Sequence, residues 1–319
     1  MATSAAKSTV QPPAGGQMSD RDFQALLTAG TDEVFKRGFE TPFQGDMFYE
    51  DMALTKQTHT TQTTVGMGNI GRNDDGETIR NDSQSLGFAH SMSSIEYRGK
   101  AEWTRKLLED ELYGQLTDNS VELMQGANRT VEEIMADGIN RGLGAAGTAH
   151  PFLCEDGLGL IASGRPNPHP LGGTWSNLES TAAISPSSIF TAMLAFRAHK
   201  NERGQKNPLR MTTMYIRPQD EAAVVEALNS QLRPTDSMNA VNHLAGRGIT
   251  YMIYDYMSSA YILYKGEGAV RNELKSLWRV RPTVDEWPKT DTDVFAVRVR
   301  FRYGVGCGRP DCFRGGIVS

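Results

Sequence analysis

The sequence has few cysteines, no long apolar run and only a mild charge, and each shortage excludes a class of protein. Three cysteines in 319 residues are too few for a disulfide scaffold and favour synthesis in a reducing cytoplasm. No stretch approaches the roughly 18 consecutive apolar residues of a membrane helix, and the first residues lack the apolar core of a secretory signal. A formal net charge of -5 gives no support to a dedicated nucleic-acid-binding protein, which is usually basic.

The motifs of the familiar enzyme classes are also missing. The chain has no His-Glu-x-x-His, Gly-x-Ser-x-Gly, P-loop or paired-carboxylate motif. The glycines of Gly66–Gly71 match the dinucleotide fingerprint by letter, but polar residues precede them and Arg72 with a turn sequence follows, so the required strand and helix are not predicted. Cys307 and Cys312 supply half of a zinc site at most, and we interpret them as free thiols in a turn. We therefore expect no catalytic residue, no cofactor and no metal.

The N-terminal third combines an arm with an unusual polar stretch. Residues 1–18 are small and polar with several Pro and Gly, which indicates a flexible arm. Residues 55–99 are rich in Thr, Gln, Asn, Ser and Gly, and the turn sequence Asn73–Gly76 lies in their middle. This pattern predicts a long two-stranded ribbon that is polar on both faces, with a disordered insert as the alternative. Such a ribbon is barely stable alone and needs a partner surface.

The centre of the chain carries helical periodicity, and irregular alternation follows. The helical pattern begins near Ala101 and Trp103, continues as one apolar stripe from Leu123 to Ile139, and ends at Gly142. We then expect a loop block over 154–177, a helix capped by Ser185 with Pro186 at its first position, a strand over 210–216, a helix from Pro218, and two aromatic-rich strands over 249–257 and 260–264. Irregular alternation of helices and strands predicts an α+β fold.

The last distinctive stretch is a ladder of arginines. Residues 295–303 alternate apolar or aromatic residues with Arg298, Arg300 and Arg302, which predicts a strand with one apolar and one guanidinium face. The guanidinium face is either solvated, a subunit contact, or a nucleic-acid surface. Among the functional interpretations we prefer the subunit contact, because guanidinium groups suit fixed bidentate pairing with carboxylates. Base readout would need an aromatic platform or a recognition helix, and neither is predicted.

The order of these parts resembles that of tailed-bacteriophage major capsid proteins, which have the Hong Kong 97 phage fold. Three stretches are similar to Mu-like major head subunits: Asp75–Arg80, Asp156–Asn177, and Trp278–Pro282 together with Thr292–Gly304. The resemblance implies five parts. These are an N-terminal arm (1–55), an extended loop (56–99), a peripheral domain with a spine helix (100–159), an axial domain (160–275), and the return strand of the peripheral domain with the C-terminal tail (276–319).

The resemblance also implies a function. It is that of a major capsid protein that self-assembles into hexamers and pentamers of an icosahedral phage shell around double-stranded DNA. The ribbon and the aromatic arm would lie on neighbouring subunits. The expected subunit-contact residues are Arg72, Glu77 and Arg80 on the loop, with Arg98, Arg298, Arg300 and Arg302.

The implied partners are other copies of the chain, a portal, and a scaffolding protein that is separate because no long helical segment precedes the arm. The resemblance leaves room for a decoration protein. DNA would bind non-specifically by charge, and no membrane is involved. The protein would be made in the bacterial host cytoplasm and reside in the virion.

One departure from the relatives and three alternatives remain. Some relatives weld the loop to a neighbour through a Lys–Asn bond, but no lysine lies between Gln57 and Gly99, so we predict no such cross-link. An encapsulin-like or gene-transfer-agent shell protein would keep the fold and change the role. A nucleotide-dependent soluble enzyme and a nucleic-acid-binding module are the alternatives from other classes.

Overall fold

The computed structural model describes residues 42–70, 72, 75, 78, 82, 84–104, 113–143, 152–169, 172–179, 183–230, 241–259, 261–289 and 294–318. The fold is α+β, as predicted, and the chain divides into two compact units. Within the described residues, one unit comprises residues 100–104, 113–125, 284–289 and 294–298, and the other comprises the rest.

The predicted apolar stripe forms a single long helix. Helix α3, Tyr113–Asn140, has 28 residues. Its stripe is buried, with Val131, Met135 and Ile139 fully inaccessible and Met124 nearly so. These positions recur at intervals of three or four residues or their sum, as one face of a helix requires. The prediction of this stripe is confirmed.

The predicted start of the helix is wrong. Residues 101–104 belong instead to strand β4, Ile95–Thr104. Along this strand Tyr97 and Trp103 alternate with charged residues at 96, 98, 100 and 102. That two-residue period is the pattern of a strand. The apolar residues from Trp103 onward also fit a helical spacing, and for this reason the sequence predicted a helix there.

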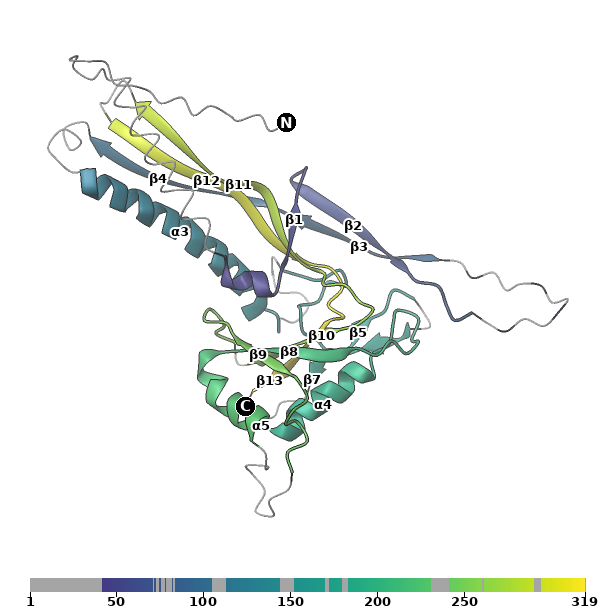
Figure 1. Cartoon of the computed structure of the whole chain (residues 1–319). Coiled ribbons are helices and arrows are strands. Elements are labelled where there is room, and N and C mark those ends of the chain that lie inside the picture. The colour runs from purple at the N-terminus through teal and green to yellow at the C-terminus, as the bar shows by residue number, and fades with distance from the viewer. Residues whose placement is uncertain are drawn as a thin grey trace, which may run out of the picture. The chain divides into compact units, whose positions relative to one another are not determined.

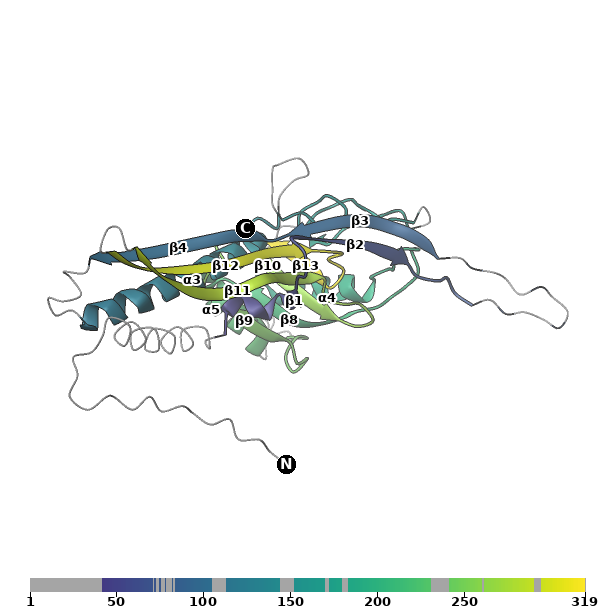
Figure 2. The same ribbon diagram turned by 90° about the horizontal axis from the view of Figure 1, so that it is seen from above.

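Strand β4 lies at the edge of a four-stranded sheet with the order β1-β11-β12-β4. Its other strands are β1 (Glu50–Ala53), β11 (Leu274–Lys289) and β12 (Val294–Cys307). Strand β1 is parallel to β11, and Figure 2 shows β4, β12 and β11 running alongside one another. On β12 the side chains of Val297, Val299, Phe301 and Tyr303 are buried, while the intervening arginines are partly exposed. The predicted two-faced strand is confirmed.

A second sheet carries a large apolar core. Its order is β7-β13-β10-β8-β9, formed by β7 (Leu178–Glu179), β13 (Phe313–Ile317), β10 (Tyr261–Glu267), β8 (Arg210–Ile216) and β9 (Thr250–Ile253). Helices α4 (Pro186–Arg197) and α5 (Glu221–Asn229, preceded by the 3-10 turn η3, Pro218–Asp220) pack on it through Ile189, Phe196, Val224 and Ala227 (Figure 1). Ser185 caps α4 in a capping box with Ser188, as its sequence predicted.

The two aromatic-rich strands predicted near residue 255 exist, but they do not pair with each other. Strand β9 lies parallel to β8, and β10 lies antiparallel to β8 on its other side. The predicted strand over 210–216 is confirmed and forms the middle of this arrangement. The two strands are neighbours in sequence, but β8 lies between them in the sheet.

The polar stretch forms the predicted ribbon. Strand β2, Thr58–Val65, is antiparallel to β3, Ser85–Ser93, and the pairing runs from Thr58 opposite Ser93 to Val65 opposite Ser85. Both views show the two strands side by side (Figures 1 and 2). For these strands the alternative of a disordered insert is wrong. Three short elements complete the described fold: the 3-10 turn η1 (Gln44–Met47), β5 (Arg165–Pro166) and β6 (Thr174–Trp175).

Candidate assembly surfaces

The arginines of β12 meet a single carboxylate from β4. Glu96 accepts a hydrogen bond from Nε of Arg98 at 2.9 Å, and the same oxygen lies 3.9 Å from Nε of Arg300. The hydrogen bond from Arg98 is the largest cause that lowers the pKa of Glu96, and Arg300 and Arg302 lower it further. Three guanidinium groups therefore surround one carboxylate, so this cationic face carries an excess of positive charge.

The other face of the same strands is closed by aromatic side chains. The rings of Tyr97 and Phe301 stack with their centroids 5.2 Å apart, and those of Trp278 and Tyr303 lie 4.4 Å apart. Phe301 and Tyr303 are buried. Because successive side chains of a strand point to opposite faces, this aromatic layer holds the arginines on the exposed side.

Of the predicted contact residues, the structure gathers Arg98, Arg300 and Arg302 around Glu96. Arg298 lies two residues before Arg300, on the same face of β12. Arg72 lies in the segment between β2 and β3. Glu77 and Arg80 lie outside the described residues.

Sequence reasoning missed Glu96, which organises the cationic face. The charged residues alternate along the whole of β4, from Glu96 through Arg98 and Lys100 to Glu102. This alternation was the available signal, since it marks one polar strand face. The helical pattern predicted from Ala101 onward overlaps the end of this strand.

Polar contacts attach the ribbon to the rest of its own unit. Arg203, in the loop between α4 and β8, donates from Nη1 to both carboxylate oxygens of Asp82, at 2.8 and 3.0 Å. Asp82 also accepts a hydrogen bond from the backbone of Gly68. Nearer the base, the hydroxyl of Thr63 on β2 hydrogen-bonds Glu155. Met92 on β3 also packs with Leu54 and Leu277 in a small apolar cluster, so polar and apolar contacts together hold the ribbon.

Glu155 is the most strongly perturbed carboxyl group near the ribbon. Its burial raises the pKa to about 7, although Arg309 and the Thr63 hydroxyl favour the charged form. Asp311 and Asp156 add to the upward shift. The charge of this side chain therefore changes close to neutral pH, at the point where the ribbon meets its own subunit.

The segment around η1 is fixed to helix α3. The buried carboxylate of Glu132 on α3 accepts hydrogen bonds from the backbone N–H groups of Gln44 and Gly45, at the start of η1. The ring of Phe48 then packs between Tyr215 and Tyr254, with centroids 4.4 and 5.0 Å away.

For this part of the arm, the expectation that its aromatics lie on a neighbouring subunit is wrong. Phe48 and Tyr49 are buried within their own chain. The earlier aromatics Phe35 and Phe39 lie outside the described residues.

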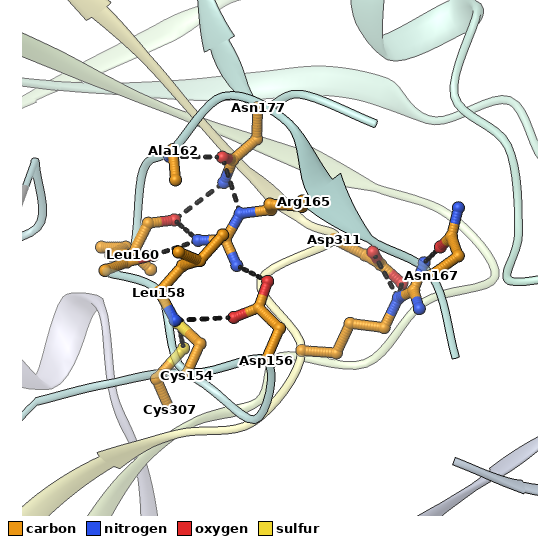
Figure 3. A network of polar contacts seen from close by, with 12 residues as sticks. Cys154, Asp156, Leu158, Leu160, Ala162, Arg165, Asn167, Asn177, Cys307 and Asp311 are labelled. Carbon is orange, nitrogen blue, oxygen red and sulfur yellow. Dashed lines mark hydrogen bonds and ion pairs between the residues drawn. The ribbon is translucent and has the colours of Figure 1, made fainter. Parts of the chain in front are cut away.

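A buried polar network organises the loop block after α3 (Figure 3). Arg165 is fully buried and donates to Oδ1 of Asn177 at 3.0 Å, to Asp156 at 2.7 Å and to the carbonyl oxygens of Gly159 and Leu160. Asn177 in turn donates to the carbonyl oxygens of Leu160 and Phe313. A buried charge is tolerated when it is paired and hydrogen-bonded in this way.

A second arginine joins the same region to the C-terminus. Arg309 donates from Nε to both carboxylate oxygens of Asp311, at 2.7 and 2.6 Å, and from Nη2 to Asn167 at 2.9 Å (Figure 3). The polar groups of both networks are occupied by one another and by backbone carbonyls. The arrangement therefore fixes the shape of this loop block.

The described glycines of the motif, Gly66 and Gly68, do not have the arrangement of a phosphate site. Gly66 and Gly68 lie in an irregular segment after β2. A pyrophosphate would need the backbone N–H groups of such a turn, but that of Gly68 donates to Asp82. Across the described ranges, we find neither a group of three or more metal-ligating side chains nor a helix with the length and apolarity that a membrane crossing requires.

Comparison with known proteins places this fold among phage shells. Residues 93–315, most of the chain, match the model of a family described as phage capsid protein. None of the curated proteins matches the chain significantly.

Solved structures share the fold at low sequence identity. A structure from Mycobacterium phage Patience is 10% identical with a TM-score of 0.58, covering 98% of this chain and 95% of that one. The capsid of an empty GTA particle is 12% identical with a TM-score of 0.54, covering 86% and 89%. The procapsid of bacteriophage JBD30 is 14% identical with a TM-score of 0.51, covering 92% and 75%. The Hong Kong 97 fold expected from the sequence is thereby confirmed, and the chain belongs to the phage capsid protein family.

Proposed function

We propose that this capsid protein assembles, through ring-closing contacts between identical subunits, into hexamers and pentamers of an icosahedral shell around double-stranded DNA. The observation that carries the proposal is the β2–β3 ribbon. It has no third strand among the described residues, and Val65 and Met92 are the buried members of its strands. A two-stranded ribbon is marginally stable in water, so we infer that another subunit supplies the surface that covers it.

The parts of the chain then take the following roles. Residues 1–55 are the N-terminal arm, 56–99 the extended loop, 100–159 the peripheral domain with its spine helix, 160–275 the axial domain, and 276–319 the return strand and C-terminal tail. The long helix α3 supports the assignment of the peripheral domain, and the five-stranded sheet supports that of the axial domain.

The cationic face of β4 and β12 is, in this proposal, a contact between subunits. Arg98, Arg300 and Arg302 share Glu96, so a carboxylate from a neighbour would complete their pairing. Each copy has 38 acidic residues against 33 basic ones and can supply it. Arg298 on the strand and Arg72, Glu77 and Arg80 on the loop are proposed to make further contacts. Many modest contacts acting together would hold the shell.

We propose a separate scaffolding protein and a portal as further partners, with room for a decoration protein on the finished shell. Packaged DNA would be held by its phosphate charge, independent of base sequence.

A gene-transfer-agent shell is a second candidate role, because the capsid of an empty GTA particle shares the fold with a TM-score of 0.54. Sequencing of the DNA in purified particles separates the two roles. A phage shell contains the genome that encodes it, whereas a gene-transfer particle contains fragments of host DNA.

Electron microscopy of the purified chain tests the assembly proposal. We expect wild-type protein to form closed shells or rings of subunits. Arg300→Glu should lower the yield of these assemblies several-fold, whereas Arg300→Lys, which keeps the charge, should retain most of the yield. Circular dichroism of each variant verifies folding. Normal shells from Arg300→Glu would leave the cationic face as a solvated sheet surface, and a small fixed oligomer from the wild type would overturn the shell itself.

A further inference from the structure

The three cysteines are all buried, and two of them are adjacent. The sulfur atoms of Cys154 and Cys307 lie 2.6 Å apart, although the residues are separated by 153 positions in the sequence (Figure 3). Cys154 belongs to the loop block after α3, and Cys307 is the last residue of β12. The sequence drew attention to Cys307 and Cys312, which are near each other along the chain, but the fold selects the distant partner.

Backbone hydrogen bonds hold the chain in place around both cysteines. The N–H of Cys154 donates to Leu158 at 2.8 Å, and its carbonyl accepts from Gly157 at 2.9 Å, so the residue sits in a closed turn. Next to Cys307, Gly308 donates to Glu273 at 2.9 Å and accepts from Glu155 at 3.4 Å. The last of these bonds joins the residue after Cys154 to the residue after Cys307. The two chain segments therefore lie beside each other where they carry the two cysteines.

We propose that Cys154 and Cys307 are oxidised to an intramolecular disulfide once the protein has left the reducing cytoplasm. In this step each thiol gives up one hydrogen and a sulfur–sulfur bond forms. Dioxygen accepts the two electrons and two protons and becomes hydrogen peroxide, which balances the reaction. Sulfur atoms this close need a small movement to reach the bonded distance of about 2.05 Å.

The surroundings explain why the bond forms late and then persists. Burial raises the pKa of Cys307 well above the usual value for a thiol, and a hydrogen bond with Cys154 raises it further. Since the thiolate is the reactive form, the sulfur of Cys307 stays reduced while reductants are abundant. After oxidation, the same burial keeps attacking thiols away from the bond.

The bond would join two distant parts of the second unit. The closed loop of 153 residues includes α4, α5 and most strands of the five-stranded sheet. A cross-link across so long a loop restricts the unfolded chain strongly. Particles would therefore gain resistance to heat on release, without any change in the contacts between subunits.

The first test is a thiol count on particles and on the purified full-length chain, both kept in air and then denatured without reductant. Three thiols per chain react when the pair is reduced, and we expect one after oxidation. Blocking with N-ethylmaleimide followed by proteolysis and mass spectrometry should recover one linked peptide pair, containing Cys154 and Cys307 and lighter by two hydrogen atoms.

Single substitutions identify the partners. Cys154→Ala and Cys307→Ala should each abolish the linked peptide and the upward shift in melting temperature that oxidation produces. Cys312→Ala is the matched control, because this third buried cysteine should leave both unchanged. A glutathione redox series on the wild-type chain provides a readout that does not depend on any variant.

Three reactive thiols after full exposure to oxidised glutathione, or a linked peptide containing Cys312, would overturn the proposal. Since the chemistry is measured on the isolated chain as well as on particles, its failure is distinct from a failure of shell assembly.

Discussion

The five-stranded sheet and the β2–β3 ribbon differ in how far their side chains are buried within the subunit. The sheet has α4 and α5 packed on it, and Phe196, Met214 and Val224 in its core are fully buried. The ribbon exposes most of its side chains, including Leu86 at 69%. The sheet is therefore stabilised within the subunit, whereas we infer that the ribbon gains its stability from neighbours. Substitutions in the two regions should separate folding from assembly.

The largest effect on folding is expected at the core of the sheet. Phe196→Ala removes a fully buried ring from α4 and should lower the free energy of unfolding by about 3–5 kcal/mol. Urea denaturation of the isolated chain measures it. Leu194→Ala on the same helix is the matched control, since Leu194 is 48% exposed and its loss should cost much less. Equal losses at the two positions would contradict the buried core described for this sheet.

A pH-dependent effect is expected where the ribbon meets its subunit. The pKa of Glu155 is raised from 4.5 to about 7 in the folded protein, so unfolding releases a proton between these values. Stability should therefore fall as pH rises from about 4.5 to about 7 and level off above. Glu155→Gln should flatten this slope, as measured by melting temperatures across the range.

The control for the pH series is Glu226→Gln on the exposed side of α5, which should keep the wild-type slope. If Glu155→Gln and the wild type lose stability in parallel as pH rises, another group is responsible for the dependence.

A substitution in the ribbon should leave the stability of the subunit unchanged and lower the yield of shells, whereas a core substitution acts on stability. Leu86→Asp places a charge on a side chain that is already exposed, so the free energy of unfolding of the isolated subunit should change by less than about 0.5 kcal/mol. If the ribbon lies on a neighbour, the yield of shells should fall several-fold, whereas Leu86→Met should assemble normally. Sedimentation of the assembly reaction gives both yields. Full assembly of Leu86→Asp would mean that this part of the ribbon stays in solvent.

The last prediction is that no covalent Lys–Asn bond joins the ribbon to a neighbouring subunit. Because no lysine lies between Gln57 and Gly99, boiled and reduced particles should run as a single subunit band on a denaturing gel. A ladder of subunit multimers would contradict this prediction and show that subunits are covalently joined.

Much of the fold was predictable because local rules act over a few residues. The cap at Ser185 and the proline after it set the start of α4, and the apolar run over 210–216 became β8. The alternation on β12 survived folding because its aromatic face is buried. Two strong patterns compete at residues 101–104, and there tertiary pairing with β12 selected the strand over the helix.

The candidate contacts were predictable only in part. The arginine ladder was visible as a pattern, but Glu96 lies about two hundred positions earlier in the chain and enters the cationic face only through pairing of β4 with β12. The same holds for Arg203 with Asp82, and for Arg165 with Asn177. Polar partners of this kind have no characteristic spacing, because the fold alone determines which loops meet.

By itself, the sequence determined the parts of this protein and their order: a polar ribbon, a long helix, an α+β block and a two-faced closing strand. These follow from side-chain periodicity and turn chemistry, which are local. Only the tertiary structure decided which β4 carboxylate the arginines meet, that the end of the arm packs on its own chain, and that Cys307 lies against Cys154. Those choices depend on contacts between residues far apart in sequence, and burial enforces them only when the whole core closes.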